Sequence, residues 1–271
     1  MQNLRGQRQI PTIDPAVVRT VNSPGTRGMD SSAFVVRRND IAAAVEIADR
    51  KARPSNQLIT RLNADVFRRL RPFLKQVNLS KDEYLYQQDD PITAVYFPES
   101  AVISEFQIAE DGRTIEVSVT GSEGAVGITA ALNSSHAINC TQVCVPGTAW
   151  RIESEVLERE AARDPALHEL LHEYVNSQIR HLSQKLICNT FHSVEQRFCT
   201  WLLLLRNRSH VNKFRLTHEH AARVLGVHRP SVTFIAQHLR DRKLISYSRG
   251  RISITDHTRL ERVACRCYSE L

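Results

Sequence analysis

The chain has 271 residues, enough for two domains with cores of their own, and a formal net charge of +7. The charge is unevenly distributed: residues 55–205 carry 13 basic and 19 acidic side chains, whereas residues 206–271 carry 14 basic and 5 acidic ones. This basic C-terminal segment predicts contact with a polyanion. No apolar run reaches the length of a membrane span, and the N-terminus has no apolar signal-peptide core, so a membrane protein and a secreted protein are both unexpected.

Residues 1–56 contain scattered arginines, prolines and glycines and too few apolar residues to build a core. We expect a basic, mostly disordered extension, with one short helix at 40–52 that Asp40 would cap.

From about residue 57 the pattern changes to a helical segment at 58–74 followed by short strands. The strands are expected at 83–87, 94–98, 101–108, 113–120, 141–145 and 148–153. Between two of them, the sequence AEDG at 109–112 predicts a hairpin. In the strand after it, Ile115, Val117 and Val119 alternate with Glu116, Ser118 and Thr120. Residues 57–163 therefore predict an antiparallel β-roll, similar to a jelly roll.

A long helix is expected over 164–190, because Asp164 and Pro165 form a helix start and apolar residues recur with helical spacing. Its length and stripe favour a dimerisation helix shared by two subunits; the alternative is a core helix packed on its own roll. The stripe consists of Leu167, Leu171, Tyr174, Val175, Gln178, Leu182 and Leu186. A second, mostly buried helix is expected over 193–206.

Residues 217–245 predict a helix–turn–helix, with Thr217 as N-cap of the first helix and Gly226 in the turn. In the second helix one face carries an apolar stripe: Val232, Ile235, Ala236 and Leu239. The opposite face carries Pro230, Thr233, Phe234 and Gln237. Pro230 fits the first helical turn and should push Arg229 out of the helical region, to the helix mouth.

The segment 244–255 then predicts a two-stranded hairpin, turned at Arg249 and Gly250, which would form the wing of a winged helix. Arg229 is expected to reach a guanine edge or a phosphate, and Phe234 to contact a thymine methyl or to pack on a neighbouring domain. The predicted DNA-binding residues are Thr217, His228, Arg229, Pro230, Ser231, Thr233, Phe234, Gln237, Arg249 and Arg251.

The chain resembles the Crp/Fnr family of bacterial transcription regulators in AVYFPESAVIS, DGRTIEVSVTGSEGAVG, RFCTWLLLL and the helix–turn–helix with its wing. The resemblance covers about 57–268. It implies an α+β fold with a cyclic-nucleotide-binding-like β-roll, a dimerisation helix, and a winged helix over 191–271. It also implies a homodimer on a two-fold symmetric operator, with half-sites roughly 34 Å apart. RNA polymerase is a candidate further partner.

Several positions depart from the family pattern. Ile128 stands near the glutamate that holds the ribose in the cyclic-nucleotide branch, and Ala137 and Ile138 stand near its Arg-Ser pair. The phosphate would lack a cation, so cyclic AMP is not expected to bind and the effector stays open. No cysteine precedes Cys140, so no iron–sulfur cluster of the oxygen-sensing type is expected. In the reading helix only Arg229 matches the family pattern, so the operator should differ.

The sequence also offers a catalytic alternative. His168, Glu169 and His172 match the HExxH pattern of zinc hydrolases, but Val175 and Gln178 stand where an extended motif continues. We expect neither a metal site nor an enzyme, and keep a β-roll protein-interaction module as a further alternative.

The six cysteines form no CxxC pair, which predicts reduced thiols in a cytoplasmic protein. A redox-sensing role for Cys265 and Cys267, or for Cys140 and Cys144, is the alternative.

Overall fold

The computed structural model describes residues 54–270. The expectations for residues 1–53, including the helix at 40–52, lie outside this part of the chain. Asn56, which the sequence assigned to the extension, belongs to the folded domain. Its side chain is fully buried, accepts hydrogen bonds from the amides of Leu58 and Ile59, and donates to the carbonyls of Pro98 and Gly124.

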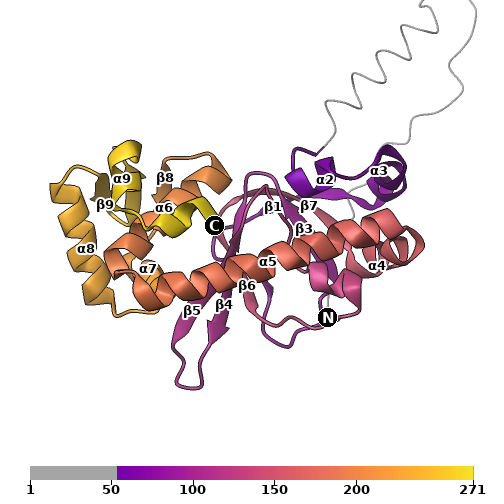
Figure 1. Ribbon diagram of the computed structural model, residues 1–271, viewed down its shortest axis with the longest axis horizontal. Helices are drawn as coiled ribbons and strands as arrows, with labels where there is room; N and C mark the ends of the chain where they lie inside the picture. Colours follow the sequence, from indigo (N-terminus) through magenta and orange to yellow (C-terminus); the bar gives the residue numbers. More distant parts are fainter. Residues whose placement is uncertain (1–53, 271) are drawn as a thin grey trace, which may run out of the picture. The chain divides into compact units, whose positions relative to one another are not determined.

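The N-terminal domain is an antiparallel roll of two sheets, in the strand orders β1-β7-β3 and β2-β6-β4-β5 (Figure 1). Its strands are β1 (Lys75–Leu79), β2 (Tyr84–Tyr86), β3 (Ala94–Pro98), β4 (Val102–Ile108), β5 (Thr114–Thr120), β6 (Cys140–Val145) and β7 (Gly147–Glu153). The six expected strands are present within two residues of their predicted ends. β1 was not predicted, because only its last residue is buried and its sequence carries little apolar signal.

The helical segment expected at 58–74 is divided into α2 (Gln57–Thr60), α3 (Ala64–Leu70) and the 3-10 turn η1 (Arg71–Phe73). The break occurs where Asn63 caps α3, its side chain accepting a hydrogen bond from the amide of Val66 at 2.9 Å. Asparagine at an N-cap competes with helix continuation, since its side chain satisfies an amide that would otherwise bond within the helix.

β5 does not keep the simple alternation read from its sequence. Glu105 pairs with Ser118 and Phe106 with Glu116, so Val117 is an extra residue in a β-bulge. A bulge shifts the following residues by one position relative to the sheet faces. The expected common face of Ile115, Val117 and Val119 is therefore wrong: Val119 is buried, the other two are half-buried, and Glu116 is fully buried.

α4 (Ser154–Arg163), not predicted, leads into α5 (Pro165–Phe191), the long helix, whose N-cap is Asp164. The predicted dimerisation stripe divides along this helix. Leu167, Leu171 and Tyr174 are buried against the roll of the same chain, so their assignment to a subunit interface is wrong. The spacing of these three residues is that of any helix packed on an apolar surface. In its N-terminal half, α5 is therefore a core helix packed on its own roll, which was the alternative prediction.

The C-terminal domain consists of helices around a small sheet in the order β8-β10-β9. Its elements are α6 (Val194–Ser209), β8 (Lys213–Arg215), α7 (His218–Leu225), α8 (Arg229–Asp241), β9 (Ile245–Ser248), β10 (Arg251–Ile254), α9 (His257–Val263) and the 3-10 turn η3 (Arg266–Glu270). Its core continues into the roll, because Phe106 and Val119 belong to the same cluster as Trp201 and Leu225. The α+β class and the antiparallel roll expected from the sequence are confirmed. Within residues 54–270 no helix has both the length and the apolar character needed to span a membrane.

Candidate nucleic-acid interface and ligand cavity

The helix–turn–helix is formed by α7 and α8. Thr217 caps α7, its hydroxyl accepting a hydrogen bond from the amide of His220 at 3.1 Å. Gly226 ends α7 in the left-handed region, with φ of 63°, where a residue with a Cβ is strained. Val232, Ala236 and Leu239 of α8 are buried in the domain core. The apolar stripe of α8 thus holds the helix in place and leaves its other face free.

The exposed face of α8 carries the polar residues and the aromatic side chain expected there. Phe234 is 75% exposed and does not pack on another part of residues 54–270. All ten predicted DNA-binding residues are exposed. The hydroxyl of Thr233 donates to the carbonyl of Arg229, and the amide of Gln237 donates to Asp241.

One detail at the start of α8 differs from the prediction. The helix begins at Arg229 itself, and the extended cap conformation falls on His228, with φ of −73° and ψ of 143°. The hydrogen bond from the Thr233 hydroxyl holds the Arg229 carbonyl in the helical turn, against the preference of a pre-proline residue for extended geometry. Arg229 remains exposed at the mouth of the helix.

Two residues next to this face were not predicted. The ring of His218 stacks on that of Tyr247, with centroids 4.3 Å apart, and its Nδ1 lies 2.9 Å from the hydroxyl of Thr233. Burial and the positive charge of Arg229 lower the pKa of His218, which favours the neutral ring. The first turn of α7, α8 and the wing therefore meet at one point. The sequence feature that could have identified His218 is its position directly after the N-cap residue Thr217.

The wing consists of β9 and β10, and their turn has φ of 48° at Arg249 and 70° at Gly250. Positive φ at both central residues is the geometry of a tight hairpin turn that matches strand twist. Arg249 and Arg251 are exposed, and the amide of Leu216 donates to the carbonyl of Gly250, which joins the wing to the start of α7. β8 adds a third strand that was not predicted from the sequence.

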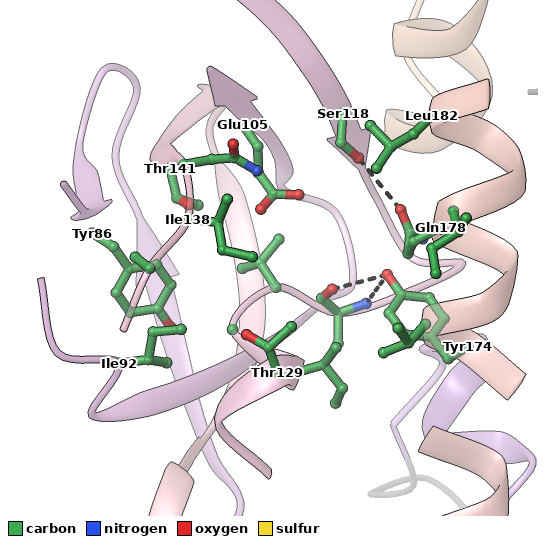
Figure 2. Close-up of a pocket in the computed structure, with 18 residues that line it drawn as sticks. Tyr86, Ile92, Glu105, Ser118, Thr129, Ile138, Thr141, Tyr174, Gln178 and Leu182 are labelled. Atoms are coloured by element: carbon green, nitrogen blue, oxygen red, sulfur yellow. Dashed lines mark hydrogen bonds between the residues drawn. The ribbon is translucent and has the colours of Figure 1, made fainter. Parts of the chain in front are cut away.

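A second feature is a cavity of about 310 Å³ between the roll and α5 (Figure 2). Among the described residues that line it, none is Lys, Arg or His, and the one charged side chain is Glu105. Ile128, Ala137 and Ile138, the positions that depart from the cyclic-nucleotide branch, all line the cavity. The remaining lining residues are Tyr86, Ile92, Ser118, Ala125, Val126, Gly127, Thr129, Asn139, Thr141, Tyr174, Val175, Gln178, Ile179 and Leu182.

The polar groups of this cavity are few and mostly paired. The hydroxyl of Tyr174 accepts from the amide of Ala125 at 2.9 Å and donates to its carbonyl at 2.8 Å. Burial raises the pKa of the Glu105 carboxyl, and hydrogen bonds from Asn139 and Ser118 oppose the rise. An anionic phosphate placed here would meet a carboxyl group and no cation from the lining residues.

Family models match two parts of the chain: a cyclic nucleotide-binding domain over residues 76–164 and a Crp-like helix-turn-helix domain over residues 196–263. Together they cover more than half of the sequence and agree with the two domains of the fold. The chain belongs to the Crp/Fnr family. It is a transcription regulator of that family, with a DNA-binding winged helix and a cyclic-nucleotide-binding-type roll.

Solved structures share this fold. A Crp/Fnr-family protein from Eubacterium rectale is 18% identical with a TM-score of 0.63, over 77% of this chain and 98% of that one. FixK2 from Bradyrhizobium japonicum is 16% identical with a TM-score of 0.60, over 71% and 98%. The c-di-GMP-responsive regulator CLP from Xanthomonas campestris is 16% identical with a TM-score of 0.58, over 71% and 99%. No curated protein matches the sequence at a significant level.

The HExxH residues have no third possible metal ligand grouped with them among residues 54–270. His168 and His172 lie on one exposed face of α5, with their Nε2 atoms 3.3 Å apart. Catalytic zinc takes three protein ligands. Within residues 54–270 the single group of three or more side chains that could share a metal ion contains neither histidine.

That group consists of Cys188, His192, Cys265 and Cys267, whose ligand atoms all lie within 4.8 Å of one another. The sulfurs of Cys188 and Cys265 lie 3.1 Å apart, within hydrogen-bond distance, and this contact lowers the pKa of Cys265 and raises that of Cys188. The sequence predicted scattered reduced thiols at these positions. The available signals were the spacing of Cys188 and His192, one helical turn apart, and the CxC pair.

Proposed function

We propose that the chain is a cytoplasmic homodimer that reads a two-fold symmetric operator with α8 and the wing, without a catalytic step. The observation that carries the proposal is the exposed N-terminal half of α8, held by its buried stripe and flanked by the basic wing. An α-helix fits the major groove, and exposed arginines beside it can pair with phosphates. The position of the operator relative to a promoter would decide whether RNA polymerase is recruited or blocked.

The second half of α5 supports the homodimer. Its exposed apolar residues are Ile179, Leu182, Leu186, Ile187 and Phe191, of which Phe191 is 77% exposed. Of the predicted dimerisation residues, Leu182 and Leu186 belong to this group. Ile179, Leu182 and Leu186 follow one another at three- and four-residue spacing on one face, the pattern of a helix that pairs with a second copy of itself.

We further propose that the roll takes a mostly apolar effector rather than a cyclic nucleotide. Ile179 and Leu182 belong both to the cavity lining and to the exposed stripe of α5. A ligand in the cavity would therefore touch the same helix that pairs two subunits. The cavity volume is at the lower end of the range for small-molecule sites.

The test is selection of bound fragments from randomised double-stranded DNA by the purified full chain, with and without cyclic AMP. We expect a two-fold symmetric motif that is the same in both. A motif that forms only with cyclic AMP would contradict the proposed cavity chemistry. Failure to enrich any motif would contradict sequence-specific reading.

Replacement of Arg229 with alanine is expected to weaken operator binding by about 1–3 kcal/mol and to relax one base preference. The reason is loss of a charged donor at the mouth of the reading helix. Binding is measured by titration of labelled operator and of single-base variants. The matched control is Arg251→Ala in the wing, which should weaken binding to all sequences alike and reduce the salt dependence. Equal affinities for wild type and Arg229→Ala would remove Arg229 from the interface.

Replacement of Leu186 with aspartate is expected to convert the dimer to a monomer, because the exposed stripe of α5 would then bury a charge in the subunit interface. Sedimentation velocity over a concentration series measures the change. Arg159→Asp, an exposed charge change on α4, is the control and should leave the dimer intact. A Leu186→Asp variant that sediments as wild-type dimer would place the interface elsewhere.

A further inference from the structure

The group formed by Cys188, His192, Cys265 and Cys267 joins parts of the chain that are far apart in sequence. Cys188 lies in the last turn of α5 and His192 is its C-cap, so both side chains are on one face at the junction with α6. Cys265 and Cys267 come from the segment after α9. The pair Cys188 and His192 thus lies beside the pair Cys265 and Cys267, although Cys188 and Cys265 are 77 positions apart in the sequence. Protein zinc sites are often built from two such pairs of ligands.

The surroundings of the three sulfurs are those of ligands rather than of core thiols. Cys188, Cys265 and Cys267 are 3–5% exposed and form a cluster of their own, separate from the apolar cores that hold the other three cysteines. Polar groups lie close to two of the sulfurs. The side-chain amide nitrogen of Gln184 is 2.9 Å from the sulfur of Cys267, and the hydroxyl oxygen of Thr200 is 3.0 Å from the sulfur of Cys265. Such outer hydrogen bonds orient metal-binding thiolates and stabilise their charge.

The spacing fits one tetrahedral ion. Zinc bonded to sulfur at about 2.3 Å and to nitrogen at about 2.0–2.1 Å holds two sulfurs about 3.8 Å apart and a sulfur and a nitrogen about 3.6 Å apart. The sulfur of Cys267 lies 3.5 Å from Nδ1 of His192. The sulfurs of Cys188 and Cys265, now 3.1 Å apart, would separate by about 0.7 Å. An iron–sulfur cluster, being larger than one ion, would need its ligands further apart.

A positive charge lies beside the group. Three thiolates, a neutral imidazole and Zn²⁺ carry a net charge of −1, which is costly to bury without a partner. Arg197 lines the same small hollow as Cys188 and Thr200. Burial lowers the pKa of its guanidinium, and the charges of Cys188 and Cys265 oppose that fall. Its Nε is buried and has no hydrogen-bond partner among the described residues.

We propose that Cys188, His192, Cys265 and Cys267 form a Cys₃His zinc site that fastens the C-terminal segment to the junction of α5 and α6. Three cysteines and one histidine leave no open position, so the site is structural rather than catalytic. On the proposed function, this junction connects the dimer helix with the DNA-binding domain. Zinc would then fix the orientation of the reading helix relative to the subunit interface.

The site is tested first without DNA. The full chain is expressed in medium supplemented with zinc and purified under reducing conditions. Elemental mass spectrometry should then find about one zinc ion per chain. Cys267→Ala should lose the metal, whereas Cys140→Ala, which removes a buried roll thiol outside the group, should retain it. Replacement by Co²⁺ should give the absorption of a tetrahedral thiolate complex. Wild-type protein with less than about a tenth of a zinc ion per chain, or with a Cys188–Cys265 disulfide in its place, would overturn the proposal.

A milder variant avoids loss of folding. Gln184→Leu removes the donor to Cys267 and keeps all four ligands, and it should lower zinc affinity by about 10–100-fold in competition with a chelator. Unchanged affinity would contradict the assigned hydrogen bond to a ligand.

DNA binding is a separate readout. Chelator-stripped protein should bind its operator more weakly and recover with added zinc. Stoichiometric zinc with unchanged operator affinity would overturn the coupling alone, and stoichiometric zinc with no DNA binding at all would overturn the proposed function instead.

Discussion

Replacing Glu116 with alanine is expected to destabilise the folded chain by about 3–5 kcal/mol. Glu116 is fully buried in β5, and three donors converge on its carboxylate. The hydroxyl of Ser104 lies at 2.8 Å, the indole nitrogen of Trp201 at 3.1 Å, and the ammonium of Lys185 at 3.1 Å. Removal of the carboxylate leaves a cation and two neutral donors without their acceptor in a site of low dielectric, which costs more than the pair itself contributes.

Urea unfolding of the full chain measures the change in the free energy of unfolding. Glu110→Ala, an exposed carboxylate in the β4–β5 hairpin, is the control and should change it by less than about 0.5 kcal/mol. The double variant Glu116→Leu with Lys185→Met should be more stable than Glu116→Ala, because no unpaired charge stays buried. If Glu116→Ala lowers the free energy of unfolding by less than about 1 kcal/mol, the three donors form hydrogen bonds to water in place of the carboxylate.

Glu116 also connects the roll with the DNA-binding domain. Its partners come from β4 of the roll, from α5 and from α6 of the DNA-binding domain. Ser118, two residues along β5, lines the cavity. The same short strand therefore lines the cavity and holds the first helix of the DNA-binding domain. A shift of β5 on ligand binding would act directly on this carboxylate.

Local signals predicted the winged helix well. The N-cap at Thr217, the left-handed turn at Gly226 and the hairpin turn at Arg249 each depend on residues adjacent in sequence, and each is present. The strands of the roll followed from period and turn residues in the same way. α4 was missed because five of its ten residues are charged and its apolar face is narrow.

What the sequence could not predict depends on contacts between distant segments. The stripe of α5 has one period throughout, and the period does not say that Leu167 packs on the roll while Leu186 stays exposed. The bulge at Val117 arises from pairing with β4 and turns Glu116 inward. Cys188 and Cys265 are brought together by the docking of α9 and η3 on the long helices, which no local spacing reveals.

The second large effect is expected on acidification. Between pH about 6.5 and about 4, His220 alone should remove about 3 kcal/mol from the free energy of unfolding. His220 is 8% exposed in α7, and its ring packs against those of Trp201 and Phe106. Burial is the main reason that its pKa is lowered to about 4, and the nearby charges of Lys81 and Arg223 add to it. The neutral ring is therefore strongly favoured in the folded chain.

The sign follows from proton binding. Above pH 6.5 the imidazole is neutral in both states and contributes no pH dependence. As the pH falls from 6.5 towards 4, the unfolded chain binds a proton that the folded chain does not, so stability falls with pH; below about 4 both states are protonated and the loss is complete. Urea unfolding at intervals over this range, with the same series for His220→Phe, measures the difference, because phenylalanine keeps the ring packing and cannot be protonated. His228→Gln, which changes an exposed histidine at the mouth of α8, is the control and should follow the wild-type curve. If His220→Phe loses stability as steeply as the wild type, other groups carry the acid sensitivity and the imidazole of His220 is solvated in the folded chain.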